Sequence, residues 1–204
     1  MEIIVANGSH LKYARIISDT ITESAKVRGT GIAQRTPEYI AKRLENGNAV
    51  IALDGDTFAG FCYIEVWGNK DFVANSGLIV HPRFRNQGLA KKIKKAIFEL
   101  SKEKFPQAKI FGITTGLPVM KMNYELGYKP VTFSELTDDP DFWKGCQTCK
   151  NIDILTRTER KMCLCTGMLY DPKAQKKKKD KINGKAFKRL KSIKESLFLK
   201  KNRK

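Results

Sequence analysis

The sequence of 204 residues lacks long apolar segments and internal repeats. It contains no run of about 18 apolar residues, so no membrane-spanning helix is predicted. Residues 1–8 include neither a basic segment nor a long apolar one, and we therefore expect no signal peptide. The expected location is the cytoplasm, where the five cysteines would serve metal binding or burial rather than disulfides.

Acidic residues are scarce in one part of the chain. Residues 172–204 hold 15 Lys and Arg but two acidic residues, a formal charge of +13 out of the total of +18. The residues before them hold 24 basic and 19 acidic side chains, which nearly balance. This distribution predicts one domain over residues 1–171 and a basic tail over residues 172–204.

The tail combines two kinds of sequence. Residues 173–181 form a low-complexity basic run, for which we expect disorder. Residues 185–200 place Phe187, Leu190 and Ile193 at intervals of three, as in a basic amphipathic helix. The tail is expected either to be a solvated appendage or to contact nucleic acid, a ribosome or an anionic surface.

Apolar periodicity predicts a mixture of strands and helices before the tail. Strands are expected at residues 3–6, 48–53, 57–67, 72–80, 110–114 and 162–170, and helices at residues 11–25, 37–46, 89–104 and 118–126. On the helix at 89–104, the face opposite the apolar stripe is expected to carry Lys91, Lys92, Lys94 and Lys95. Residues 128–160 show no clear pattern.

The segment 76–90 carries the clearest functional signal. A buried strand is expected to end at Val80, and Pro82 stops further pairing in the sheet. Gly88 and Ala90 then let a ligand approach the start of the next helix, whose free N–H groups and dipole suit a pyrophosphate. Positive charge is added by Arg83, Arg85, Lys91 and Lys92. The alternative is a plain strand-to-helix connection with a glycine in its turn.

This pattern differs from the Gly-x-Gly-x-x-Gly dinucleotide fingerprint and from the P-loop. Val80, Pro82, Arg85, Gly88 and Ala90 instead resemble the Val-x-Pro-x-x-Arg-x-x-Gly-x-(Gly/Ala) motif of the GNAT superfamily of acyl-CoA N-acyltransferases, with Asn86 at a frequent glycine position. Residues 123–128 resemble the family's Tyr-x-x-x-Gly-Phe segment. The order of elements over residues 1–170 is also similar to that of the family. The sequence further resembles a bacterial subgroup with a cysteine-bearing C-terminal stretch, here residues 132–170.

The resemblance implies an α/β (α+β) fold with a mixed, mostly antiparallel sheet flanked by helices. A splayed pair of parallel strands would hold acetyl-CoA or another short acyl-CoA, with its pantetheine arm along residues 77–80. Backbone N–H groups there would stabilise the oxyanion. The residues that the resemblance implies for CoA binding are Leu78, Ile79, Val80, Arg85, Asn86, Gln87, Gly88, Leu89, Ala90 and Lys91.

An attacking amine must lose a proton, and Glu65 on the neighbouring strand is the candidate base. The alternative for Glu65 is an exposed strand carboxylate. The family often places a tyrosine acid where this sequence has Asn123, and the tyrosine falls at Tyr124, about 100° further around the helix. Tyr124 and Asn123 are therefore both candidates, and Asn123 could instead hydrogen-bond the cofactor.

Arg28 and Arg35 are candidates for substrate binding, because the loop after the first helix borders the acceptor pocket in this fold. An arginine there suits a carboxylate and hence an amino acid as the acceptor, whereas the alternative is a mobile loop with surface charges. The leading function is N-acetyltransferase activity on a small primary amine. The alternatives are acetylation of a protein N-terminus or lysine with docking through the tail, and a non-catalytic CoA-binding or RNA-associated adaptor. A homodimer is compatible with the sequence.

Four cysteines lie in two pairs, Cys146-x-x-Cys149 and Cys163-x-Cys165. Four thiolates at this spacing could hold a structural zinc ion that fastens residues 128–160 to the last strand. The alternative is a set of free or redox-linked thiols. Cys62 lies in an apolar strand and is expected to be part of the core.

Overall fold

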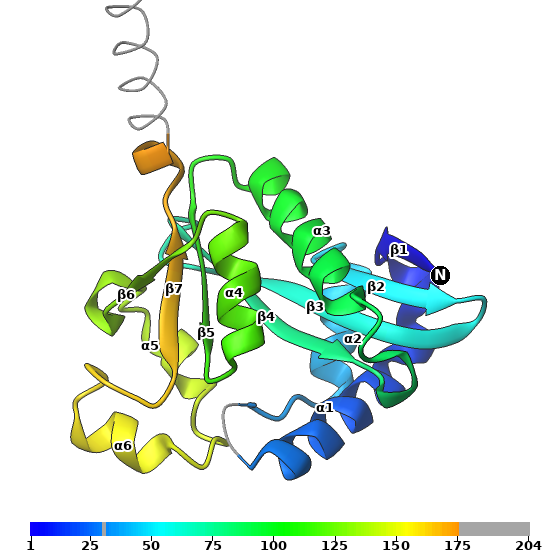
Figure 1. Ribbon diagram of the computed structural model, residues 1–204, viewed down its shortest axis with the longest axis horizontal. Coiled ribbons are helices and arrows are strands. Elements are labelled where there is room, and N and C mark those ends of the chain that lie inside the picture. The colour runs from blue at the N-terminus through cyan, green and yellow to red at the C-terminus, as the bar shows by residue number, and fades with distance from the viewer. Residues whose placement is uncertain (30–31, 176–204) are drawn as a thin grey trace, which may run out of the picture. The chain divides into compact units, whose positions relative to one another are not determined.

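The computed structural model describes residues 1–29 and 32–175 (Figure 1). The chain divides into two units, Met1–Tyr170 and Asp171–Lys204. In the second unit the description covers residues 171–175, where the Asp171 carboxylate accepts a hydrogen bond from the Lys173 N–H at 2.8 Å. The predicted helix at 185–200 and most of the basic run at 173–181 lie outside the described residues. Within the described ranges no helix is both long and apolar enough to cross a membrane.

The first unit is built on one seven-stranded sheet with the order β1-β2-β3-β4-β5-β7-β6. Its strands are β1 (Glu2–Val5), β2 (Ala49–Asp54), β3 (Thr57–Trp67), β4 (Phe72–Val80), β5 (Lys109–Thr114), β6 (Lys129–Val131) and β7 (Thr166–Tyr170). β4 and β5 pair in parallel, and the other neighbours pair antiparallel. The predicted mixed, mostly antiparallel sheet is therefore confirmed.

Helices cover both faces of this sheet (Figure 1). They are α1 (Ala14–Arg28), α2 (Pro37–Glu45), α3 (Leu89–Lys104), α4 (Leu117–Glu125), α5 (Pro140–Lys144) and α6 (Ile152–Arg157). Alternate residues of the central strands face opposite sides, so Cys62 and Ile64 pack in the α3 cluster while Phe61 and Tyr63 pack in the α1–α2 cluster. Cys62 is fully buried, as predicted.

The N-terminal helix begins later than its apolar spacing predicts. Asn7 caps a 3₁₀ segment, Gly8–Tyr13, and the α-helical geometry starts at Ala14 rather than Leu11. α2 begins as predicted, because the Thr36 side chain accepts a hydrogen bond from the Tyr39 N–H at 3.2 Å with Pro37 in the first turn.

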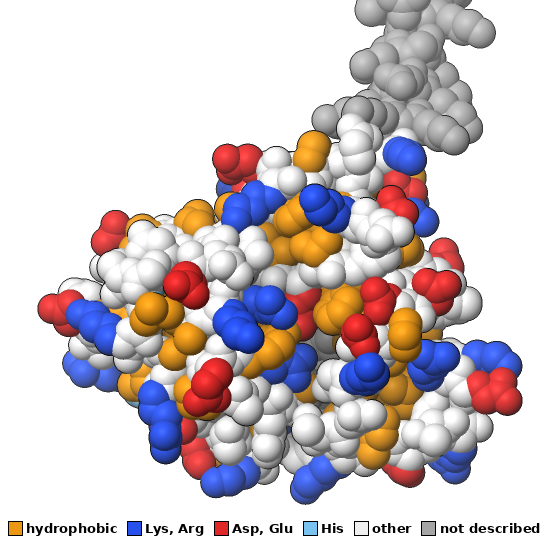
Figure 2. Space-filling model, turned by 180° about the vertical axis from the view of Figure 1, so that it is seen from behind, with side chains coloured by type: hydrophobic (Ala, Val, Ile, Leu, Met, Phe, Trp, Pro, Cys, Tyr) orange, Lys and Arg blue, Asp and Glu red, His pale blue; other side chains and the backbone are white. Residues whose placement is uncertain are grey.

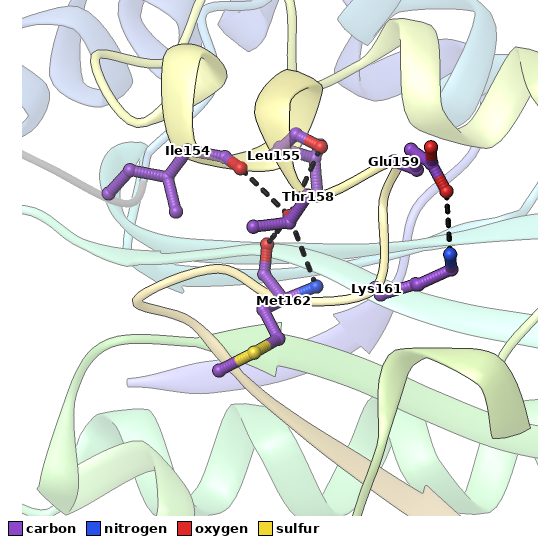
Figure 3. Close-up of polar contacts among 6 residues, drawn as sticks. All are labelled: Ile154, Leu155, Thr158, Glu159, Lys161 and Met162. Carbon is purple, nitrogen blue, oxygen red and sulfur yellow. Dashed lines mark hydrogen bonds and ion pairs between the residues drawn. The ribbon is translucent and has the colours of Figure 1, made fainter.

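Residues 128–170 contain elements that the sequence pattern does not reveal. β6 and the short helices α5 and α6 occupy the stretch without clear periodicity, and β7 begins at Thr166 rather than at Met162. Phe142 and Trp143 of α5 anchor a third core cluster against β4 and β5. After α6, the Thr158 hydroxyl lies 2.8 Å from the Ile154 carbonyl and 2.7 Å from the Met162 carbonyl, which fixes the approach to β7 (Figure 3).

Candidate active site

The parallel strands β4 and β5 separate soon after they begin. They pair through Phe72–Lys109, Val73–Ile110 and Ala74–Phe111. Beyond these pairs β4 continues to Val80 and β5 to Thr114, but the two strands no longer pair with each other. The predicted splayed pair is thus present, and its inner edges leave backbone groups available to a ligand.

A β-bulge in β4 turns its second half away from the regular ladder. Phe61 of β3 pairs with Ile79, but Tyr63 pairs with Ser76, so β4 has one residue more than β3 over this interval. Gly77 in the bulge has φ +63°, a conformation that glycine adopts without strain.

A cavity of about 170 Å³ lies at this separation of the strands. Its wall includes residues from β3, β4, β5, α1, α3 and α4 and from the stretch before β7. Leu78 and Ile79, two of the predicted CoA-binding residues, line it. Figure 2 shows one face of the molecule hollowed near its middle, with hydrophobic, basic and acidic side chains around the hollow.

The loop before α3 is shaped for an anion. Asn86 and Gly88 have φ values of +62° and +72°, and asparagine is one of the few other residues that tolerates this region, which explains its place at a frequent glycine position. The first intrahelical bond runs from the Lys92 N–H to the Gly88 carbonyl at 3.3 Å. The N–H groups of Leu89, Ala90 and Lys91 precede it and have no helical acceptor.

Open space lies beside this loop, since a Cβ at Gly88 would meet no atom within 4 Å. These residues therefore fit a pyrophosphate, which needs N–H donors and room near the backbone. They lie outside the lining of the cavity.

Two basic side chains of the motif have structural partners. Arg85 Nε donates to the Val80 carbonyl at 3.2 Å and Arg85 Nη2 donates to Ser24 Oγ at 3.1 Å, so this side chain fastens the end of β4 to α1. The Lys91 ammonium pairs with the Glu125 carboxylate at 2.6 Å. Gln87 donates to the Arg83 carbonyl at 3.5 Å. Because these side chains already have protein partners, we expect the loop to bind CoA mainly through its backbone N–H groups.

Glu65 of β3 lines the cavity and is buried, with 6% of its surface exposed. The Tyr39 hydroxyl donates a hydrogen bond to its carboxylate, and Arg43 lies 4.0 Å away. Burial and the Glu65 charge raise the pKa of Tyr39, which keeps the phenol protonated as a donor. Glu65 is therefore an oriented carboxylate in the cavity wall rather than an exposed one.

Both predicted substrate-binding arginines also line the cavity. Arg28 is exposed at the end of α1, whereas Arg35 is partly buried and donates from Nε to the Tyr63 hydroxyl at 2.8 Å. Burial lowers the pKa of Arg35, but Tyr63 and Glu65 more than offset this and leave it raised. Arg35 thus holds a fixed positive charge in the same cavity wall as Glu65.

The structure separates Asn123 from Tyr124. Asn123 lines the cavity with 1% of its surface exposed, and its Oδ1 atom is buried without a hydrogen-bond partner in the described part of the chain. Tyr124 is 71% exposed and does not line the cavity. Successive residues of a helix point in different directions, so Asn123 and Tyr124 cannot both face the cavity. The position at which the family often has a tyrosine is therefore occupied by the amide of Asn123.

Helical periodicity predicts the wrong environment for Lys94. Its position was expected among surface lysines, yet it is 2% exposed and lines the cavity. The apolar stripe of α3 is wider than predicted, because it packs against β2, β3 and β4, and Lys94 lies at its edge.

Three of the four C-terminal cysteines, Cys146, Cys149 and Cys165, line the cavity. All five cysteines are free. Burial raises the pKa of Cys146 to about 11 and that of Cys165 to about 12, so both are thiols at neutral pH. Among the described residues no group of three or more metal-ligating side chains is arranged to hold a metal ion, so the zinc site stays a prediction.

Solved structures of several acyltransferases share this fold. N-acetylglutamate synthase from Neisseria gonorrhoeae, solved with coenzyme A and N-acetyl-glutamate, is 14% identical with a TM-score of 0.58 and covers 83% of this chain. The match spans about a third, 34%, of the synthase. None of the curated proteins gives a significant match to this chain.

Two other structures match over most of both chains. YncA from Salmonella typhimurium, solved with its cofactor acetyl-CoA, is 12% identical with a TM-score of 0.57 and covers 84% of this chain and 94% of its own. Ribosomal-protein-alanine N-acetyltransferase from Brucella melitensis is 12% identical with a TM-score of 0.56, and the match covers 84% of this chain and 99% of that enzyme. At these identities the likeness establishes the fold.

The sequence itself carries the family assignment. The profile of the acetyltransferase (GNAT) family matches residues 19–120, half of the chain, including the loop before α3 and the splayed strand β4. The chain therefore belongs to the acetyltransferase (GNAT) family and is an acyl-CoA N-acyltransferase.

Proposed function

We propose that this enzyme transfers an acetyl or other short acyl group from CoA to the primary amine of a small molecule that also carries a carboxylate, such as an amino acid. The observation that carries the proposal is the charge of the cavity. Three basic side chains, Arg28, Arg35 and Lys94, line it together with one carboxylate, Glu65. A cavity with this excess of positive charge favours an anionic acceptor.

In this proposal each part of the site has a separate task. Acetyl-CoA supplies an activated acyl group, and the N–H groups of Leu89, Ala90 and Lys91 bind its pyrophosphate. The unpaired inner edge of β4 positions the pantetheine arm. Backbone N–H groups of the same edge stabilise the negative charge that develops on the carbonyl oxygen.

Glu65 acts as the base in direct attack by the amine. An ammonium ion has no free electron pair, so its proton must leave before the nitrogen can form a bond to the carbonyl carbon. The Tyr39 hydroxyl fixes the orientation of the Glu65 carboxylate. Glu65 therefore accepts the proton, directly or through one water molecule.

Arg35 binds the carboxylate of the acceptor. Its Nε atom is occupied by Tyr63 and its Nη1 atom by the Gln34 carbonyl at 2.9 Å, which leaves Nη2 without a hydrogen-bond partner among the described residues. A planar guanidinium held in this way offers a fixed donor to a carboxylate.

A thiol-release screen tests this function. Purified enzyme would be given acetyl-CoA or succinyl-CoA with each amino acid, its decarboxylated amine and common polyamines. The proposal expects turnover with at least one amino acid and at least tenfold lower kcat/KM for its decarboxylated counterpart. Turnover that prefers amines without a carboxylate would contradict it.

The +13 charge of residues 172–204 favours a second candidate, acylation of a protein amine on an anionic particle such as a ribosome. Truncation after residue 171 separates the two. Full turnover of a small amine by the truncated enzyme supports the first candidate. Activity confined to protein acceptors and lost on truncation supports the second.

A further inference from the structure

A lysine without a carboxylate partner is buried in the wall of the cavity. Lys94 lies on α3, and its Nζ atom donates a hydrogen bond to Asn75 Oδ1 at 3.3 Å. Nζ also lies 5.0 Å from the centre of the Tyr128 ring. No acidic oxygen of the described residues lies within 4.0 Å of it.

The neighbours of Lys94 are held in place. Asn75 Oδ1 also accepts from the Tyr128 hydroxyl at 3.0 Å, and Asn75 Nδ2 donates to Ser101 Oγ at 2.7 Å. An ammonium group has three N–H donors, of which Asn75 takes one. The remaining donors have no protein acceptor among the described residues, and Lys94 lines the cavity together with Asn123.

Asn123 gives a second, independent indication of a ligand here. Its buried Oδ1 atom accepts no hydrogen bond from the described residues, and such an acceptor is costly to bury unless a ligand satisfies it. The unpaired acceptor of Asn123 and the unused donors of Lys94 therefore belong to one cavity wall.

We propose that Lys94 is the general acid of this enzyme and donates a proton to the CoA sulfur as the thioester bond breaks. This inference rests on the proposed acyl transfer. It assigns to Lys94 the protonation of the leaving sulfur, a step that the exposed Tyr124 cannot perform because it lies outside the cavity lining. The amine nitrogen forms a bond to the carbonyl carbon, and the C–S bond then breaks with its electron pair left on sulfur. Lys94 gives one proton to that sulfur and becomes neutral. Glu65, after it has passed the first proton of the ammonium ion to water, takes the second proton from the nitrogen of the tetrahedral intermediate, and exchange with water restores both groups.

The electrostatics of the site suit this step. Burial lowers the pKa of Lys94 to about 8, close to that of an ordinary thiol at about 8.5. A proton can then pass between the two groups with little change in free energy.

Two other titratable groups face Lys94. Cys62 on β3 donates to the Ser76 carbonyl at 3.2 Å, and burial raises its pKa to about 11. Burial also raises the pKa of Tyr128 well above its ordinary value. Both stay neutral between pH 6 and about 9, so among these three side chains a change of charge in that range belongs to Lys94.

Substitution of Lys94 by methionine tests the assignment, with Lys95→Met as the matched control on the exposed face of the same helix. At pH 7 we expect kcat of Lys94→Met to fall about 100-fold, as on loss of a general acid, with little change in Lys95→Met. The wild-type kcat should decline as pH rises past about 8, and Lys94→Met should lack this decline. Lys94→Gln, which can still donate to Asn75, is the second variant in case the methionine protein folds poorly.

A titration of the bound thiol gives a readout that does not depend on turnover. Thiolate absorbance of CoA bound to the wild type should appear at a pH about 1 lower than for CoA bound to Lys94→Met or Lys94→Gln, because an adjacent ammonium favours the thiolate. Equal thiol titration in wild type and variants, or an unchanged kcat, would overturn the role of Lys94. Failure of the wild type itself to bind CoA would instead overturn the proposed function.

Discussion

The ring of Tyr63 occupies the space in which a side chain at position 77 would lie. A Cβ atom on Gly77 would come within 2.3 Å of Tyr63 Cε1. The Tyr63 hydroxyl accepts the hydrogen bond from Arg35 Nε at 2.8 Å. The bulge that separates β4 from the regular ladder and the arginine that we propose for acceptor binding are therefore connected through one aromatic ring.

Gly77→Ala should consequently disturb both the bulge and the pocket. The positive φ and the clash with Tyr63 together should cost about 1–3 kcal/mol of the free energy of unfolding. Denaturant unfolding and kcat/KM would be measured. Gly8→Ala is the control, because a Cβ there meets no atom within 4 Å, and it should change neither quantity. Equal free energies of unfolding for Gly77→Ala and Gly8→Ala would contradict the expected clash with Tyr63.

Glu65→Gln should abolish base catalysis while it preserves the fold. The amide has nearly the same shape and can still accept from Tyr39, but it cannot take the proton of the amine. We expect kcat to fall about 100-fold and CoA affinity to stay unchanged. Glu99→Gln, on the exposed side of α3, should retain full activity. A Glu65→Gln enzyme with wild-type kcat would exclude Glu65 as the base.

Arg35→Lys should weaken binding of the acceptor specifically. Lysine keeps the charge but loses the fork that joins Tyr63 and the substrate carboxylate, so the KM of the acceptor should rise about tenfold or more. The KM of acetyl-CoA should stay unchanged. Arg15→Lys is the control, since Arg15 lies exposed on α1 and pairs with Asp19. A rise confined to the KM of acetyl-CoA would place Arg35 elsewhere in the mechanism.

The buried ammonium of Lys94 should also make stability depend on pH. The folded pKa of about 8 lies below the ordinary value of 10.5, so between these values the unfolded chain binds more protons and wild-type stability increases with pH. Lys94→Met should be more stable than the wild type by about 1–3 kcal/mol at pH 7, and this advantage should vanish by about pH 10.5. Urea unfolding at both pH values measures it. A difference independent of pH would show that Lys94 is not desolvated.

The sequence pattern predicts the parts of the fold that local chemistry decides. The strand before Pro82, the turn at Gly88 and the helix from Leu89 follow from residue type and apolar spacing, and the structure has them where expected. Glu65 is placed in the site because a strand next to the motif brings it there. Its partners Tyr39 and Arg43 come from α2, 22 or more positions away, and no local pattern reveals them.

Other features depend on packing that no local pattern contains. Lys94 fits a solvent-facing position of an isolated helix, and its burial follows from the extent of the sheet beneath α3. The bulge at Gly77 depends on the ring of Tyr63 across the strand pair. Residues 128–165 lack periodicity because their elements are short, so the approach of Cys146 and Cys165 to the cavity appears only in three dimensions.

Binding of CoA by the backbone at the start of α3 is the central claim, and calorimetry with CoA tests it most directly. Gly88→Asp would place a negative charge at the proposed pyrophosphate site. Gly55→Asp is the matched control, because Gly55 shares the positive φ, at +58°, and the open surroundings but lies in the hairpin between β2 and β3. We predict that Gly88→Asp weakens CoA binding at least tenfold, about 1.4 kcal/mol, and that Gly55→Asp binds like the wild type. Wild-type protein without affinity for CoA, or a Gly88→Asp variant that retains it, would contradict the account.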